Sequence, residues 1–183
     1  SGESPMVGDR GFAGIARRSA RTPLIAAVEG FAVAGGLEVA LACDLIVAGR
    51  SAKLGLPEVR RSLVAYGGAL LRLPARVGHG ATMELALTGE PVDGERAHAI
   101  GLVDRLADDG AALDVALELA AAIAENAPLA LVASKEIVWR QADWGEDRWE
   151  RQWEIAAPVI ASEDAREGAT AFAEKRAPVW RGR

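Results

Sequence analysis

The stretch AVAGGLEVALACD, residues 32–44, places two glycines and a glutamate in a run that is otherwise small and apolar. Its pattern predicts a tightly packed helix over residues 36–43, followed by a buried strand over 44–49. A charged side chain in such surroundings is costly unless a partner neutralises it or a reaction uses it. Glu38 is therefore the residue of this stretch that calls for an explanation.

A helix that begins near Gly35 would offer unpaired backbone N–H groups at its positive end. The glycines Gly35 and Gly36 would let an oxygen of another molecule approach those donors closely. Glu38 follows one turn later on the same face, and Glu58 follows Pro57 on a turn twenty residues further on. A donor and two carboxylates suit proton transfer beside a carbonyl. Spacing alone leaves open the alternative that both glutamates cap helix starts or face solvent.

Composition and charge narrow the class of protein. The chain has 183 residues, of which 50% are hydrophobic and 26% charged, and its net charge of -5 argues against nucleic acid as a partner. Its single cysteine, Cys43, excludes an internal disulfide. No apolar run is long enough to span a bilayer, and no secretory signal is recognised. These features predict a cytoplasmic protein with no membrane partner.

Short strands in the first half give way to helices in the second, which is typical of an α/β core with a helical C-terminal region. We expect a core over residues 1–125 and a helical region over 126–183. Residues 1–8 should be loose. The expected strands and helices are a helix over 9–20, strands over 24–30 and 102–106, a short strand and turn over 52–59, and helices after Gly68, Asp93, Pro128 and Ser162.

The helix expected over 112–126 has an apolar face, formed by Leu113, Ala116, Leu117, Ala120 and Ile123. Trp149 and Trp153 are spaced i, i+4 on another predicted helix, where packing or a subunit contact is the simplest interpretation.

Several segments, taken in order, resemble the enoyl-CoA hydratase/isomerase (crotonase) family. They are AAVEGFAVAGGLEVALACDLIVAG (26–49), AKLGLPEV (52–59), LTGEPVDGERAHAIGLVDRL (87–106) and EGATAFAEKR (167–176). The resemblance runs from about Arg21 to the end of the chain. Linked motifs in a fixed order are far more specific than any one of them, and they favour the functional interpretation of the two glutamates.

The resemblance implies a spiral core of ββα units with a helical C-terminal region, assembled as a homotrimer or a dimer of trimers. It implies an acyl-CoA thioester as substrate, with the Gly35 amide as one of two oxyanion-hole donors. Glu38 and Glu58 would hold the water that adds syn across a trans-2-enoyl-CoA, and one of them would move the proton at the α carbon. No metal or redox cofactor is expected, because the thioester already acidifies that carbon.

Further residues take binding roles by the same resemblance. Phe172 and Lys175 match positions that contact the CoA of a neighbouring subunit. Tyr66 stands where many family members have glycine. It either shapes the acyl pocket, beside Gly36, or fills core space.

The chain also departs from the family pattern. The family's second oxyanion donor lies in an alanine-aspartate loop, preceded by further strands, and neither the loop nor the strands occur in this sequence. Loss of such a donor costs about 2.7–4 kcal/mol of transition-state stabilisation. Two alternatives to a hydratase therefore stay open: an isomerase or other enolate chemistry of the family, and a non-catalytic acyl-CoA-binding subunit of an oligomer.

Overall fold

The computed structural model describes residues 6–17 and 20–183. The chain folds as two compact units. The first contains the described residues up to Ala20 and Leu24–Leu119, and the second contains Arg21–Pro23 and Ala120–Arg183. Each unit is described by itself.

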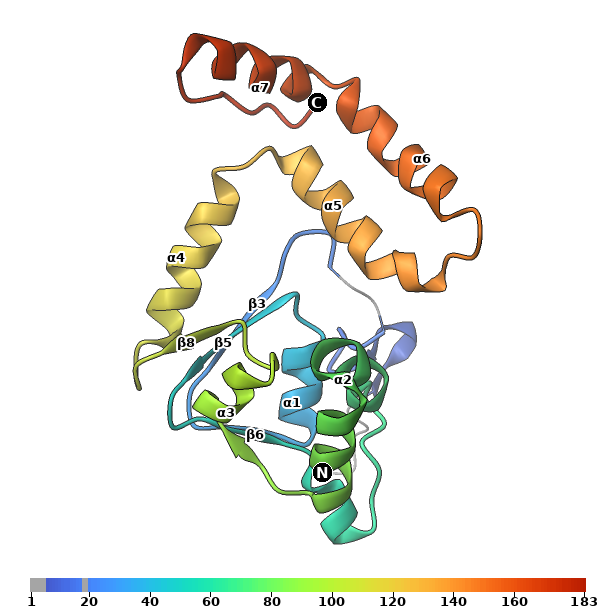
Figure 1. Ribbon diagram of the computed structural model, residues 1–183, viewed down its shortest axis with the longest axis vertical. Coiled ribbons are helices and arrows are strands. Elements are labelled where there is room, and N and C mark those ends of the chain that lie inside the picture. Colours follow the sequence, from blue (N-terminus) through green and yellow to red (C-terminus); the bar gives the residue numbers. More distant parts are fainter. Residues whose placement is uncertain (1–5, 18–19) are drawn as a thin grey trace. The chain divides into compact units, whose positions relative to one another are not determined.

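The first unit is built on two small sheets (Figure 1). One is wholly parallel, in the order β3 (Ile25–Val28), β5 (Leu45–Gly49), β8 (Arg105–Ala107). The other has the order β4 (Phe31–Val33), β6 (Lys53–Gly55), β7 (Val92–Asp93), with β6 parallel to β4 and antiparallel to β7. Between β3 and β4 the chain turns at Gly30, whose φ of 68° suits glycine. Among the described residues, β3 and β4 each pair with another strand on one side only.

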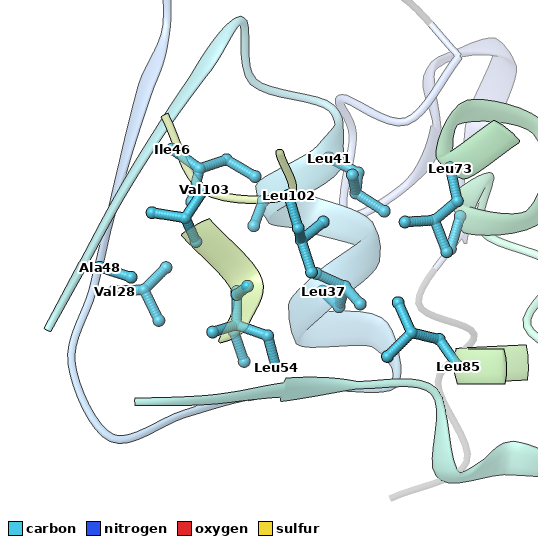
Figure 2. Packing of buried hydrophobic residues seen from close by; sticks show 14 of the residues in the cluster. Val28, Leu37, Leu41, Ile46, Ala48, Leu54, Leu73, Leu85, Leu102 and Val103 are labelled. Carbon is cyan, nitrogen blue, oxygen red and sulfur yellow. The ribbon is translucent and has the colours of Figure 1, made fainter. Parts of the chain in front are cut away.

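Helix α1 (Gly35–Leu41) lies in the core of this unit, together with α2 (Ala69–Thr88) and α3 (Gly94–Ala99). Figure 2 shows side chains from α1, α2 and the two sheets converging on one cluster. The largest fully buried members of that cluster are Leu37, Ile46, Leu54, Leu56, Leu73, Leu85, Leu102 and Val103. The small residues of α1 let the helix pack this closely, as its sequence predicted.

The expectation of a helix over 9–20 is wrong. Instead, β1 (Met6–Val7) pairs with β2 (Gly11–Phe12) across a short 3₁₀ turn at Gly8–Arg10. A further turn follows, and four residues in this region have positive φ: Gly8, Gly11, Ala13 and Gly14. The glycines favour these turns over a helix. Met6 and Val7 form a strand although 1–8 was expected to be loose, and residues 1–5 lie outside the described part.

Other predicted helix boundaries are confirmed by their caps. Asp93 Oδ1 accepts a hydrogen bond from Arg96 N at the start of α3. Ser162 Oγ accepts one from Ala165 N at the start of α7 (Glu163–Glu174). Both bonds satisfy N–H groups that the first turn of a helix leaves without partners. The helix expected after Gly68 is α2, which runs to Thr88 through a break at Gly78.

Helix α4 (Ala112–Ala124) forms where expected, but its expected face is buried only in part. Ala112 and Ala116 are buried against Val47 and Ala107 in a second small core. Leu113 and Leu117, which were expected on the buried face, are both more than half exposed. Ala112 and Ala116 make the close contact with this core, whereas Leu113 and Leu117 remain exposed.

The second unit is helical. It contains α5 (Pro128–Arg140), a 3₁₀ turn at Gln141–Asp143, α6 (Arg148–Ile160) and α7. Within residues 6–17 and 20–183, no single helix is long and apolar enough to cross a membrane; α4 and α5 pass that test only when taken together across the sharp bend between them.

Residues 176–183, here called the C-terminal strap, return along α7. The buried Asp164 accepts hydrogen bonds from Arg181 N and Gly182 N at 2.7 and 2.9 Å. Glu167 accepts from Val179 N and from the Arg176 guanidinium. Two carboxylates of α7 thus hold both ends of the strap.

Candidate functional site

The N-terminus of α1 presents two amides without an acceptor. The carbonyl of Ala34 takes the N–H groups of Leu37 and Glu38, and the Ala34 amide bonds to Gly55 O at 3.0 Å. Among the described residues, the amides of Gly35 and Gly36 donate no hydrogen bond within the chain. They lie at the positive end of the helix dipole, where an oxygen with developing negative charge is stabilised.

The ring of Phe12 lies directly against Gly35. A Cβ atom at position 35 would come within 2.5 Å of Phe12 Cζ, which no real side chain tolerates. At Gly36 the same atom would meet nothing within 4 Å. Glycine is therefore required at 35 for close packing, while the surroundings of Gly36 are open.

Glu38 is the buried acid of the site, with 4% of its surface exposed. Its Oε1 accepts a hydrogen bond of 3.4 Å from Ala69 N, at the N-terminus of α2. A Cβ atom on Gly67 would lie only 2.3 Å from Glu38 Oε2. The start of α2 thus supplies both a donor and the room that the carboxylate needs.

Glu58 lies on the 3₁₀ turn Pro57–Arg61, which Pro57 opens. Its Oε2 is buried, and no hydrogen-bond partner for it exists among the described residues. Burial raises the pKa of the Glu58 carboxyl, and the nearby charge of Glu38 raises it further, against a lowering by its own backbone amide. The two glutamates thus lie within range of each other's charge.

Arg72 adds a positive charge to the same region. It donates to Gly68 O at 3.4 Å and also to the carbonyl of Ala16. Burial lowers the pKa of its guanidinium, and the charge of Glu38 opposes that effect.

The other predicted site residues lie elsewhere. The ring of Tyr66 is 71% exposed, which contradicts the interpretation that it fills core space, although its neighbour Gly67 touches Glu38. Phe172 is 86% exposed on α7, and Lys175 caps that helix with φ 55°. Both belong to the second unit, whereas the two glutamates belong to the first.

Three residues that contact this site were not predicted from the sequence: Phe12, Gly67 and Arg72. The signals were faint but present. The glycine pair at 67–68 before a helix indicates that another segment of the chain approaches closely there. Arg72 is a lone charge in the apolar run ALLRLP.

Comparison with known proteins identifies relatives of the chain in both sequence and fold. A family model described as Enoyl-CoA hydratase/isomerase matches residues 16–183. The crystal structure of enoyl-CoA hydratase EchA1 from Mycobacterium marinum is 53% identical, with a TM-score of 0.96 over 100% of this chain and 72% of that one. An enoyl-CoA hydratase structure from Mycobacterium tuberculosis H37Rv is 52% identical, with the same TM-score and coverage.

A curated relative, the carnitinyl-CoA dehydratase of Citrobacter koseri, is 40% identical over 190 residues, covering 100% of this chain and 73% of the relative. The fold is the mixed α/β fold of these relatives, and the sequence resemblance is confirmed. The chain belongs to the enoyl-CoA hydratase/isomerase, or crotonase, family.

Proposed function

We propose that this chain is a hydro-lyase that adds water syn to a trans-2-enoyl-CoA thioester, or removes it in reverse. The observation that carries the proposal is the placement of two carboxylates, Glu38 and Glu58, within range of each other's charge. Glu38 stands on α1, the helix whose first amides have no acceptor among the described residues.

The donors and acids divide the work. The Gly35 amide holds the thioester oxygen as it gains negative charge, which stabilises the enolate. Glu38 is buried and bonded to the Ala69 amide, so it is suited to orient the water and take its proton. Glu58, whose pKa is raised, delivers its proton to the α carbon while the water oxygen bonds to the β carbon. One proton enters the pair and one leaves it, so the site is restored once the proton passes from Glu38 to Glu58.

The names of the relatives support this chemistry. Two similar structures are titled enoyl-CoA hydratases, and the curated relative is named a dehydratase of a CoA thioester. Hydration and dehydration are the two directions of one reaction, so a single constellation serves both. Isomerisation of a double bond needs no water held between two acids, and we therefore place it second.

The first prediction concerns the two acids. Glu38→Gln and Glu58→Gln should each lower the hydration rate by about 10²–10⁴, the usual contribution of a positioned acid or base. The measurement is loss of the enoyl thioester absorbance with a short trans-2-enoyl-CoA. Glu84→Gln, whose side chain pairs only with Arg96 at 3.7 Å on the surface, is the matched control. Equal turnover by all four proteins would refute the assigned roles, and tight acyl-CoA binding without turnover by the wild type would favour a binding subunit.

We propose further that the chain assembles into trimers or pairs of trimers and that Phe172 and Lys175 contact the CoA held by a neighbouring subunit. The support is the exposure of Phe172, which leaves a large apolar ring without cover in the single chain. Lys175 offers a cation suited to phosphate.

A further inference from the structure

Arg72 connects two segments that the sequence separates by more than fifty residues. Its guanidinium donates to Ala16 O in the N-terminal turn and to Gly68 O at the start of its own helix. A Cβ atom on Gly68 would lie 2.2 Å from Arg72 Nη1, so the end of the guanidinium lies close to that backbone. The fork of an arginine can make such bonds in two directions at once, and the ammonium of a lysine is a single point.

Backbone hydrogen bonds in the N-terminal turn connect Ala16 to Phe12. Ile15 N and Ala16 N both donate to Phe12 O, at 3.2 and 3.1 Å, and Gly14 N donates to Gly11 O at 3.1 Å. The carbonyl that Arg72 holds therefore belongs to a residue already bonded to Phe12. Ala16 is itself buried, which leaves the turn little room to shift.

Phe12 in turn lies on Gly35, where the proposed oxyanion donor is. The contact is so close that a methyl group at 35 would overlap the ring. We propose that Arg72 is a positioning residue: it fixes the turn that presses Phe12 onto Gly35, and its charge faces Glu38 across the same site. This inference rests on the proposed hydration chemistry and assigns Arg72 no contact with the substrate.

The two parts of this role can be separated by substitution. Arg72→Lys keeps the charge but loses the fork, whereas Arg72→Gln keeps a donor but loses the charge. The titratable group that faces this charge is Glu38 from α1, and the charge of Glu38 acts in turn on Glu58 from the 3₁₀ turn. Arg76→Lys is the control, because Arg76 lies one turn along the same helix and bonds to Leu102 O and Asp104 instead.

Hydrogen exchange of the full chain tests the positioning without relying on activity. Both Arg72 variants should speed exchange of the amides in residues 10–17 by about tenfold or more, while Arg76→Lys leaves them as in the wild type. Unchanged exchange in both Arg72 variants would overturn the proposal, whatever their activity.

Kinetics with a short trans-2-enoyl-CoA then test the consequence. Arg72→Lys should lower kcat by about 10- to 100-fold with little change in KM, because misplacing a site by about 1 Å costs that much. Arg72→Gln should lower kcat at least as far, because it loses both the fork and the charge that faces Glu38. Faster exchange with unchanged kcat would overturn the role at the site.

Two remaining outcomes are covered as follows. If the wild type shows no turnover, the proposed function fails, and Arg72 is judged by hydrogen exchange alone; unchanged exchange of residues 10–17 in both Arg72 variants overturns the role. If the Arg72 variants do not fold, Phe12→Ala replaces them. It should lower kcat to a similar degree, and wild-type kcat in that variant would equally overturn the proposal.

Discussion

Glu38 holds its carboxylate in a space that only a glycine at position 67 leaves open. The distance of 2.3 Å from a Cβ at 67 to Glu38 Oε2 means that any side chain there must displace the acid. The acid, the glycine and the start of α2 are thus one arrangement at the scale of single residues. A catalytic group that is held by packing on several sides is already in its reactive orientation before the substrate binds.

Gly67→Ala should therefore act on the site more than on the fold. We expect a loss of about 1–3 kcal/mol in the free energy of unfolding from overpacking, and a fall of about 100-fold in hydration rate as Glu38 moves. Denaturant unfolding and the hydration assay check both numbers. Gly80→Ala in α2, where a Cβ would meet nothing within 4 Å, should leave activity unchanged. Full activity in Gly67→Ala would show that Glu38 tolerates displacement.

Glu58 should show the cost of a partly buried charge in its pH dependence. Because its folded pKa lies above the ordinary 4.5, the folded state binds the proton more tightly, and stability falls as the pH rises from about 4.5 through the raised value. Glu58→Gln removes that charge. Its free energy of unfolding relative to the wild type should increase from about pH 4 to about pH 7, measured by denaturant unfolding at both. A difference that does not change with pH would mean that the pKa of Glu58 is not raised.

The sequence identified the acids and the helix start but not the residues around them. Glu38 and Glu58 were found because a charge in a small apolar run and an acid after a proline are local signals. The three residues that were missed each contact a residue far away in the sequence: Phe12 contacts Gly35, Gly67 contacts Glu38, and Arg72 contacts Ala16. The fold decides which distant segments come into contact, and the spacing of residues within one segment does not reveal it.

At the scale of elements, the C-terminal strap is held by charge and backbone bonds to α7. The Arg176 guanidinium, followed by the Val179 amide, lowers the pKa of Glu167 from 4.5 to about 2. A lowered pKa contributes stability that is complete above the ordinary value and is lost as the pH falls through about 2. The strap should therefore stay attached at neutral pH and loosen in acid.

Glu167→Gln should loosen the strap at neutral pH. The variant loses the ion pair with Arg176 and weakens the acceptor for Val179 N, so we expect trypsin to cleave faster after Arg176 and Arg181. Glu174→Gln is the matched control, since Glu174 also pairs with Arg176, at 2.7 Å, but accepts no bond from Val179. Similar cleavage of all three proteins would mean that Glu167 does not hold the strap.

Elements were predicted best where a cap or a breaker fixes their ends. Asp93, Ser162 and Pro128 each mark a helix start that the structure has. The prediction of a helix over 9–20 was wrong because it followed the spacing of the apolar residues, whereas Gly11 and Gly14 favour turns with positive φ. The buried face of α4 was predicted only in part: Ala116 is buried as expected, whereas Leu113 and Leu117 are exposed and Ala112, Val115 and Leu119 pack on the small core beside β5 and β8.

At the scale of the whole molecule, large apolar side chains remain exposed on the helices of the second unit. Trp149 and Trp153 are 72% and 61% exposed on α6, a helix in which no residue is buried. Exposed aromatic residues spaced one turn apart are typical of a surface that another chain covers. They fit the proposed assembly of several copies.

Replacing both tryptophans should weaken that assembly. We expect Trp149→Gln with Trp153→Gln to lower the mass of the particle measured by light scattering, or to raise its dissociation constant at least tenfold. Glu150→Gln with Glu154→Gln, changed on the same helix, should leave the mass as in the wild type. A wild type that is monomeric at every concentration would contradict the proposed assembly itself.

The one-sided pairing of β3 and β4 has a consequence for how the protein behaves in concentrated solution. An unpaired strand border carries a row of amide and carbonyl groups that any extended peptide can match. The borders at β3 and β4, with Phe31 78% exposed on β4, favour association between molecules and the growth of insoluble aggregates. A lysine in place of Phe31 would work against that adhesion, because strands bearing charge resist stacking upon one another.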